Sequence, residues 1–538
     1  MKKLVSRFMA VLMAMTMILS MSMTAFAAEA PKGTLTVNNT VAGKTLDLYQ
    51  IFTATKNGDN VAYTLNSAYE GFFKNNTRIP GSESLTGEAL SEKAYEYVKT
   101  QVGTDGKSGT GFAKEILGWI LENATTVATT HTTATTTAGS TVISGLEYGY
   151  YVVYPLGATD TSAAPGEQDY TSVASLVSVT GDTSINMKSN YPTVVKKVND
   201  KNADDVNIGD TVTYTLTSKV PDMTGYTSYV FNFKDTLSAG LTFKEITSVK
   251  VGETTITKVD AGQEADNTYT LTQDGQNITI TMNNFLASNK DNTGKEIKVT
   301  YTATLNKDAV TGFDANKNSA TVEYSNKPGT DNKGESEPSI VDVHTFNFTI
   351  FKYYLKDETK TGLANAEFEL YKANEAGDAA DTNAKINIVK VKDGEYRQAT
   401  PEEAAAEGFK SDVIVSGTDG KVLVKGLDAG TYYLRETKAP EGYNKLLSDI
   451  KVEIKASYDE TTGKLTSYSV DYTYNGTTTT GTEIKDTTTS PEVAVENKTG
   501  AQLPSTGSKG ALMVTLAGIV LFGALTASKA FGKKKANN

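Results

Sequence analysis

The sequence contains no cysteine, only two histidines and one tryptophan among its 538 residues. Without cysteine the chain can form neither a disulfide nor a thiolate nucleophile, and zinc sites are nearly excluded. No glycine-rich phosphate loop stands at a strand–helix junction, and residues 200–205 lack the central glycine and closing glutamate of a calcium loop. We therefore expect no metal and no cofactor.

The formal net charge of −11 argues against a nucleic-acid partner and fits a soluble surface protein. A chain without disulfides must be stabilised in other ways. Large apolar cores, oligomerisation, metals or another kind of covalent link are the alternatives.

The first 27 residues have the organisation of a secretory signal peptide. Three basic residues precede an apolar run at 8–23, and Ala25-Phe26-Ala27 follows this run. A basic region, an apolar region and a small-residue cleavage site are the three parts of such a peptide. An N-terminal membrane anchor is the alternative, but the run is short for a span. We predict cleavage before Ala28 and export of the chain.

The other end carries a short motif, an apolar run and a basic tail. The motif is Leu503-Pro504-Ser505-Thr506-Gly507, the apolar run spans 511–528, and lysines follow it. This run is just long enough to cross a bilayer, and the basic tail favours a cytoplasmic C-terminus. The arrangement resembles the cell-wall sorting signal of Gram-positive surface proteins. The resemblance implies that a sortase attacks the carbonyl of Thr506, releases Gly507 onward, and transfers the acyl group to an amine.

Between these ends the sequence predicts a mainly β chain of tandem immunoglobulin-like sandwich domains. Alternating stretches such as 211–216, 297–305 and 346–353 are bounded by turn-forming residues, as is typical of strands. Apolar residues at near-helical spacing within 87–122 predict one or two helices inserted in the first domain, with an irregular loop as the alternative. Composition places the domains at 28–190, 191–340 and 341–500, before a sorting signal at 501–538, and indicates a linker at 326–338.

The third domain carries the clearest motif. Residues 432–443, with the sequence YYLRETKAPEGY, resemble the E-box of collagen-adhesin-B-type domains in Gram-positive pilins. The stretches 346–352 and 493–497 resemble the first and last strands of that family, although Asn365 stands where glycine is usual. In that family a first-strand lysine, a last-strand asparagine and the E-box glutamate form an intramolecular isopeptide bond. The resemblance implies a bond between Lys352 and Asn497, promoted by Glu436.

This chemistry is also plausible from the residues themselves. A solvated lysine is protonated and is a poor nucleophile at neutral pH, whereas burial lowers its pKa and raises that of a neighbouring carboxyl. Phe346, Phe348, Ile350 and Lys352 have the same parity and share one strand face. A lysine on an apolar face is unusual unless it is paired or has reacted. A buried Lys–Glu ion pair, or a lysine at a strand end, is the alternative.

The second domain resembles the middle domain of pilin shaft proteins in the stretches 194–198, 209–214, 233–241 and 318–324. The resemblance implies a bond between Lys196 and Asn318, promoted by Asp235. Lys196 and Lys197 point to opposite faces, so only one can react inward. The family register selects Lys196, and two solvated strand lysines are the alternative. Each bond would tie the first strand of its domain to the last, and tension along the chain could pass through it.

The first domain resembles the N-terminal domain of the same proteins, but its stretch 148–154 has no glutamate at the E-box position. We predict no isopeptide bond there. Shaft pilins also carry a lysine before the second domain that receives the threonine acyl group of the next subunit. The usual Tyr-Pro-Lys motif is absent, because Tyr191-Pro192 is followed by Thr193. Lys188 is the predicted inter-subunit lysine, Lys197 is the alternative, and Lys188 as an ordinary surface lysine is a further one.

Together these features resemble the major shaft pilin of sortase-assembled pili over essentially the full chain. The resemblance implies a structural protein on the surface of a Gram-positive bacterium, not an enzyme. Its implied partners are a sortase and copies of itself, with minor pilins, peptidoglycan and a host or surface ligand as further candidates. A non-polymerising, wall-anchored adhesin or minor pilin is the alternative. A secreted wall hydrolase would need a catalytic carboxylate pair or nucleophile, and the sequence shows neither.

Overall fold

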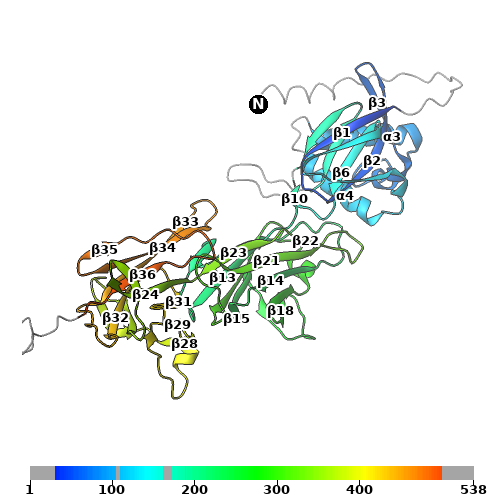
Figure 1. The fold of residues 1–538 in the computed structure, drawn as a ribbon. Coiled ribbons are helices and arrows are strands. Elements are labelled where there is room, and N and C mark those ends of the chain that lie inside the picture. The colour runs from blue at the N-terminus through cyan, green and yellow to red at the C-terminus, as the bar shows by residue number, and fades with distance from the viewer. Residues whose placement is uncertain (1–30, 104–108, 161–172, 188, 500–538) are drawn as a thin grey trace, which may run out of the picture. The chain divides into compact units, whose positions relative to one another are not determined.

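The computed structural model describes residues 31–103, 109–160, 173–187 and 189–499. The predicted signal peptide, the sorting motif, the apolar run at 511–528 and Lys188 lie outside these residues. Within the described part of the chain, no helix is both long and apolar enough to cross a membrane. The chain is mainly β, as predicted (Figure 1), and it divides into two compact units. The described residues of the first unit are those up to 310, 314–345 and 458–465, and those of the second are 311–313, 346–457 and 466–499.

The N-terminal part of the first unit contains two small sheets. One has the strand order β5–β1–β9, and the other has the order β3–β2–β6–β8 with β4 also paired to β2. Buried apolar side chains such as Leu35 and Leu48 fill the space beneath them. The strands are β1 (Lys32–Thr40), β2 (Thr45–Asn57), β3 (Asn60–Leu65), β4 (His131–Thr135), β5 (Gly139–Glu147), β6 (Gly149–Pro155), β8 (Ser175–Val179) and β9 (Thr183–Asn186), and β7 (Thr159–Asp160) pairs with β10 (Ser189–Asn190).

Two helices cover part of this region and confirm the helical periodicity of the sequence. They are α3 (Gly87–Val102) and α4 (Gly109–Glu122), and the shorter α2 (Glu70–Phe73) precedes them. Each longer helix buries one face at the spacing of a helical turn. The buried positions include Leu90, Ala94 and Val98 in α3, and Phe112, Ile116 and Ile120 in α4.

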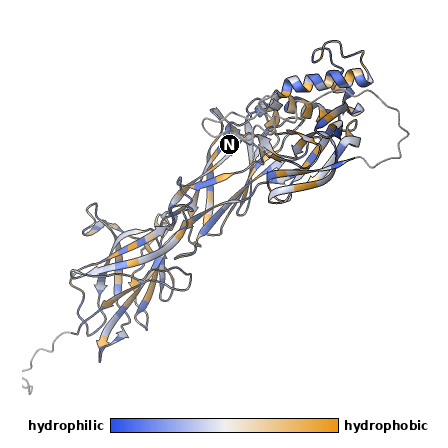
Figure 2. Ribbon diagram, turned by 90° about the horizontal axis from the view of Figure 1, so that it is seen from above, coloured by the Kyte–Doolittle hydropathy of each residue, from blue (hydrophilic) through white to orange (hydrophobic). Residues whose placement is uncertain are grey.

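The middle part of the first unit is a sandwich of two larger sheets. The lysine-bearing sheet has the order β11–β13–β20–β15–β16, and the facing sheet has the order β12–β23–β21–β14–β19–β18–β17. Alternate residues point inward, and Figure 2 shows the resulting alternation of apolar and polar positions along the strands. The bounds are β11 (Val195–Val198), β12 (Ala203–Asp205), β13 (Thr211–Lys219), β14 (Phe231–Leu237), β15 (Leu241–Val251), β16 (Thr254–Thr255), β17 (Thr257–Lys258), β18 (Thr268–Asp274), β19 (Asn277–Met282), α5 (Phe285–Asn289), β20 (Glu296–Leu305), β21 (Asn316–Ser325), β22 (Lys333–Glu335) and β23 (Ser339–His344).

Two sequence expectations for this sandwich are wrong. The stretch 326–338 contains β22, which pairs with β21, so it is not simply a polar linker. The following strand β23 lies between β12 and β21 in the facing sheet. Asn318 is therefore not on the last strand of its domain, because β22 and β23 come after it. Polar Gly- and Asn-rich composition marks turns, but it does not exclude short strands beside them.

The second unit also has two sheets. One has the order β25–β24–β31–β29–β28, with β36 paired in parallel to β24, and the other has the order β27–β26–β32–β33–β34–β35, with β30 paired to β26. The bounds are β24 (Phe346–Lys356), β25 (Thr359–Gly362), β26 (Glu367–Ala373), β27 (Ala380–Lys385), β28 (Ile388–Lys392), β29 (Glu395–Gln398), α6 (Pro401–Ala404), β30 (Ile414–Val415), β31 (Lys421–Leu427), β32 (Gly430–Lys438), β33 (Ile450–Tyr458), β34 (Leu465–Tyr474), β35 (Thr477–Thr479) and β36 (Glu492–Glu496).

Gly420 sets the close approach of β31 to β24 in this unit. Its carbonyl accepts a hydrogen bond from the backbone N–H of Lys352 at 2.8 Å, and its φ is +79°. A Cβ at this position would lie 2.2 Å from the carbonyl oxygen of Lys352. Gly394, in the turn between β28 and β29, has a similar φ of +75°, but a Cβ there would meet nothing within 4 Å.

We predict that Gly420→Ala destabilises the second unit more than Gly394→Ala. Both changes place a Cβ in a left-handed conformation, at a cost of about 1–2 kcal/mol. Only Gly420→Ala also forces the strands apart, which adds roughly 1–3 kcal/mol. Calorimetric unfolding of the two variants and the parent measures the difference. Equal destabilisation at both positions would show that the close approach is unimportant.

Candidate functional site

The middle sandwich buries a lysine, an aspartate and an asparagine together. Lys196 lies on β11, whereas Asp235 and Asn318 lie on β14 and β21 of the facing sheet. The alternation of β11 points Lys196 inward, where it is 1% exposed, while the preceding Val195 is 53% exposed. Asp235 and Asn318 are equally buried, at 2% and 0%. The structure thus brings the three residues of the predicted middle triad into one core.

A tyrosine joins these three residues. Lys196 Nζ forms an ion pair with Asp235 Oδ2 and donates a hydrogen bond to the Tyr301 hydroxyl at 2.7 Å. This hydroxyl donates to Asp235 Oδ2 at 2.9 Å and accepts from Asn318 Nδ2 at 2.7 Å. The rings of Tyr214 and Tyr301 also lie within 4.9 and 5.1 Å of Lys196 Nζ. The lysine is therefore enclosed by aromatic rings, one carboxyl group and one amide.

Burial pushes the two ionisable groups toward their neutral forms. Loss of solvent lowers the pKa of Lys196 to about 8, although the attraction of Asp235 opposes the shift. Loss of solvent also raises the pKa of Asp235, against the attraction and hydrogen bond of Lys196. Because the two pKa values move toward each other, transfer of the lysine proton to the carboxylate costs much less than it would in water. A neutral amine then becomes accessible near neutral pH.

The second unit contains a corresponding cluster of Lys352, Glu436 and Asn497. Lys352 lies on β24, Glu436 lies on β32 of the facing sheet, and Asn497 directly follows β36. Their exposed fractions are 0%, 2% and 1%. The parallel pairing of β36 with β24 places Val495 opposite Lys352, and the backbone N–H of Asn497 donates to the carbonyl of Tyr353 at 2.9 Å. The second predicted triad is also brought together.

In this cluster the carboxyl group itself contacts both nitrogen atoms. Lys352 Nζ lies 3.2 Å from Glu436 Oε1, and Asn497 Nδ2 donates to Glu436 Oε2 at 3.4 Å. Asn497 Nδ2 also donates to the Asn444 carbonyl at 2.6 Å, and the Leu446 N–H donates to Glu436 Oε2 at 2.7 Å. Burial lowers the pKa of Lys352 to about 8, against the attraction of Glu436.

The two clusters would make different connections. Lys196 and Asn318 come from facing sheets, so a bond between them would cross the middle sandwich. Lys352 and Asn497 come from neighbouring parallel strands, so their bond would lie within one sheet. In both clusters the side-chain oxygen of the asparagine has no hydrogen-bond partner among the described residues. A buried amide oxygen without a donor is unusual and leaves the carbonyl open to polarisation by a protonated carboxyl group.

A third trio of the same residue types lies on the outer face of the middle sandwich. Lys234 Nζ is 2.8 Å from Glu323 Oε2, and Asn232 Nδ2 donates to Glu323 Oε1 at 2.9 Å. The Lys234 side chain is 38% exposed. Its hydrogen bond with Glu323 raises the pKa of Lys234. Burial alone would raise the pKa of Glu323, but the hydrogen bonds from Lys234 and Asn232 outweigh this effect and lower it. In this trio the neighbouring groups stabilise the charged forms of Lys234 and Glu323. The loss of solvent, and not the closeness of the three side chains, therefore distinguishes the two buried clusters.

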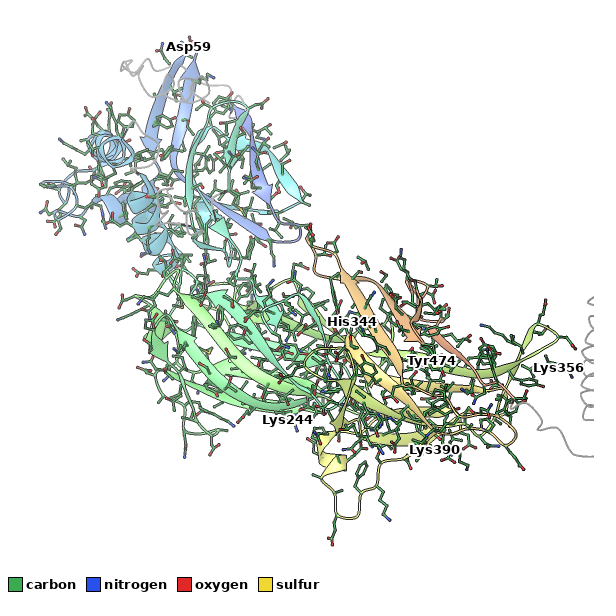
Figure 3. All side chains as sticks on the ribbon, turned by 90° about the vertical axis from the view of Figure 1, so that its left-hand side faces the viewer. Asp59, Lys244, His344, Lys356, Lys390 and Tyr474 are labelled. Atoms are coloured by element: carbon green, nitrogen blue, oxygen red, sulfur yellow. The ribbon has the colours of Figure 1, made fainter. Side chains whose placement is uncertain are left out.

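Other lysines show the same contrast. Lys244 and Lys390 lie exposed on the outside of their strands (Figure 3). Lys197, the alternative inter-subunit lysine, is half-buried on the other side of β11 and donates to Asn202 Oδ1 at 2.6 Å. Among the described residues up to 187, no lysine side chain is buried. The first domain therefore offers no third buried cluster within the described part of the chain.

Two sequence families match the domains that hold these clusters. Residues 208–328 match the Gram-positive pilin backbone subunit 2, Cna-B-like domain. Residues 349–468 match the SpaA prealbumin-like fold domain. The chain carries the domains of a Gram-positive pilin backbone subunit. The resemblance predicted from the sequence is confirmed, and the pilin backbone family is structural and not enzymatic.

Two curated proteins and one solved structure illustrate what this chain is similar to. The fimbrial subunit type 2 of Actinomyces naeslundii is 30% identical over 268 residues, which cover 46% of this chain and 48% of that protein. The trypsin-resistant surface T6 protein of Streptococcus pyogenes serotype M6 is 25% identical over 328 residues, covering 55% and 51%. The chain thus spans about half the length of the curated relatives it matches. The solved T6 backbone pilin of serotype M6 S. pyogenes has a TM-score of 0.45 at 17% identity, covering 88% of this chain and 100% of that one.

Sequence reasoning missed Tyr301. Its parity on β20 matches that of the inward-facing Val299 and Ala303, which predicts a buried ring. No pattern in the sequence places its hydroxyl beside Lys196, because that contact depends on how β11, β13 and β20 are ordered in the sheet.

The lowered pKa of Lys196 predicts how stability changes with pH in Asn318→Ala, a variant that cannot form the middle cross-link. Above about pH 8 the folded chain has released the Lys196 proton while the unfolded chain still holds it, so the free energy of unfolding rises with pH. We expect a gain of about 1–2 kcal/mol between pH 8 and 9.5 in chemical denaturation.

The double variant Lys196→Met, Asn318→Ala is the matched control and should lack this gain. The raised pKa of Asp235 acts with the opposite sign, because stability falls as pH rises above the ordinary carboxyl range. The same pH dependence in both variants would contradict a desolvated Lys196.

Proposed function

We propose that this pilin is the shaft subunit of a covalently polymerised surface pilus and that it contains two internal isopeptide bonds, Lys196–Asn318 and Lys352–Asn497. The observation that carries the proposal is the burial of a complete lysine–carboxyl–asparagine set in each of two domains. Burial of one such set could be a structural ion pair. Two sets that differ in sheet geometry but agree in residue types favour a shared chemistry.

The reaction would follow from the neutral state of each lysine. The amine attacks the side-chain carbonyl carbon of the asparagine, and a new C–N bond forms. The original C–N bond of the amide breaks, and one proton moves from the attacking to the leaving nitrogen, so that ammonia departs. Asp235 or Glu436 accepts the lysine proton beforehand, polarises the carbonyl and moves protons during the exchange. Each bond forms once, and the proton given up by the lysine stays on the carboxyl group.

These bonds would replace the missing disulfides. Each closes a loop of more than a hundred residues, which the chain-entropy model for disulfides values at about 4–5 kcal/mol. Their larger effect would be mechanical. Lys196 and Lys352 lie near the start of their domains, and Asn318 and Asn497 lie near the end, so tension could pass through the covalent bond instead of separating the strands.

Polymerisation would use the two ends of the subunit. A sortase would cut after Thr506 and transfer its carbonyl to Lys188 of the next copy, with Lys197 as the alternative acceptor. The order of sorting motif, apolar run and basic tail supports the cleavage after Thr506. The hydrogen bond of Lys197 to Asn202 weighs against Lys197 as the acceptor. Attachment of Thr506 to peptidoglycan would then be restricted to basal copies.

Intact mass tests the internal bonds. We expect the recombinant segment 28–506 to be lighter than its calculated mass by two ammonia molecules. Asp235→Ala should restore one of them and Glu436→Ala the other, because each carboxyl group serves only its own cluster. Lys234→Arg, in the trio on the outer face of the sandwich, is the matched control and should keep the full deficit. A parent chain at its full calculated mass would refute both bonds.

Polymerisation is tested by a denaturing gel of wall extracts from a Gram-positive host that expresses the full chain and its sortase. We expect a ladder of high-mass species for the parent and for Lys197→Arg, and only a monomer for Lys188→Arg. A ladder that survives Lys188→Arg but not Lys197→Arg would reverse the assignment of the acceptor. A single monomer-sized band for the parent would contradict the shaft role and favour a wall-anchored adhesin.

A further inference from the structure

The hydroxyl of Tyr301 contacts every reacting group of the middle cluster. It lies 2.7 Å from Lys196 Nζ, 2.7 Å from Asn318 Nδ2 and 2.9 Å from Asp235 Oδ2. The side chain is fully buried. Its strand β20 is fixed on both sides, since Tyr301 is opposite Tyr214 on β13 and Ile246 on β15. The position of the hydroxyl is thus set by the sheet and not by a mobile loop.

The hydrogen bonds of this hydroxyl use its full capacity. A phenol has one proton to donate and two lone pairs to accept with. The Tyr301 hydroxyl donates to Asp235 and accepts one bond each from Lys196 and Asn318. It therefore joins the nitrogen that would attack to the nitrogen that would leave, by a single oxygen atom.

We propose that Tyr301 is a catalytic residue of the middle cluster, whose hydroxyl relays a proton from Lys196 Nζ to Asn318 Nδ2 during isopeptide formation. This inference rests on the proposed Lys196–Asn318 bond. It assigns the proton transfer that releases ammonia to a residue outside the lysine, carboxyl and asparagine set.

The relay balances protons at each atom. Attack of the neutral amine on the Asn318 carbonyl carbon gives a tetrahedral centre, in which Nζ carries one surplus proton. Nδ2 is no longer part of an amide, so it gains a basic lone pair, and its hydrogen bond with the phenol can reverse. The phenol oxygen takes the proton from Nζ while its own proton passes to Nδ2. The bond from the former amide carbon to Nδ2 then breaks, ammonia leaves, and the phenol is neutral before and after.

The environment of Tyr301 suits a relay better than a base. Burial and the nearby charge of Asp235 raise the pKa of its phenol well above the ordinary value. The hydroxyl therefore stays protonated at neutral pH and can only exchange one proton for another. Asp235 accepts the hydrogen bond of this hydroxyl and fixes its orientation before the attack.

Comparison of the two clusters explains why only one needs the tyrosine. Glu436 places one oxygen 3.2 Å from Lys352 Nζ and the other 3.4 Å from Asn497 Nδ2, so its carboxyl group can move the proton by itself. Asp235 is shorter by one methylene group. It pairs with Lys196 through Oδ2, and the contact from that oxygen to Asn318 Nδ2 runs through the Tyr301 hydroxyl.

Tyr301→Phe in the segment 28–506 tests the relay, since it removes the hydroxyl and keeps the ring. We expect the middle bond to be incomplete on purification and to form about 10²–10⁴-fold more slowly than in the parent, the usual contribution of a positioned proton-transfer group. Intact mass over time should show a population that retains one ammonia and slowly loses it. The rate should rise with pH as Lys196 loses its proton.

Tyr214→Phe is the matched control. Its ring stacks on that of Tyr301 with centroids 5.1 Å apart and also lies beside Lys196 Nζ, but its hydroxyl forms no hydrogen bond with Lys196 or Asp235. It should complete both bonds, and its thermal unfolding shows whether Tyr301→Phe folds comparably. Immediate completion of the middle bond in Tyr301→Phe, or an equal delay in Tyr214→Phe, would overturn the relay.

The second cluster separates this inference from the proposed function. In Tyr301→Phe the Lys352–Asn497 bond should be complete, because Glu436 acts without a tyrosine. A parent chain that retains both ammonias would refute the isopeptide bonds themselves, and the relay with them. A parent with two bonds and a Tyr301→Phe variant with two equally rapid bonds would refute the relay alone.

Discussion

The arrangement of this protein depends on one constraint, the removal of a lysine amine from water beside a carboxyl group inside a β-sandwich. An isolated buried charge is very costly, and a buried ion pair recovers only part of that cost. At Lys196 and Lys352 the burial lowers the pKa to about 8, so the neutral amine is accessible. Conversion of the amine to an amide would remove the charge permanently. The structural cost of burial and the proposed chemistry are therefore two aspects of the same feature.

Strand order determines which connection each cluster can make. Lys196 faces Asp235 and Asn318 across the sandwich, whereas Lys352 and Asn497 lie on adjacent parallel strands with Glu436 opposite. A bond between sheets resists their separation, and a bond between parallel strands resists sliding of β36 along β24. The outer-face trio of Asn232, Lys234 and Glu323 has neither consequence, because its hydrogen bonds stabilise the charged forms of Lys234 and Glu323. The same three residue types thus act differently according to the face of the sheet on which they lie.

Much of this organisation could be predicted from local sequence patterns. The parity of Phe346, Phe348 and Lys352 predicts that the lysine points inward, and the apolar spacing within 87–122 predicts α3 and α4. Long-range features could not be predicted in this way. The strand β22 lies in a polar stretch and β23 follows it, and the pairing of both with β21 depends on the sheet. The contact of Tyr301 with Lys196 depends on the neighbours of β20. Such contacts arise from the order of strands in space, which alternation along one strand does not encode.

Peptide mapping of the mature segment by tandem mass spectrometry tests the central claim most directly, because it identifies the atoms that are joined. The account predicts two branched peptides, one linking the segments around Lys196 and Asn318 and the other linking those around Lys352 and Asn497. Lys234 and Asn232 should appear only in linear, unmodified peptides. Recovery of Lys196, Asn318, Lys352 and Asn497 in linear peptides with intact side chains would contradict the account.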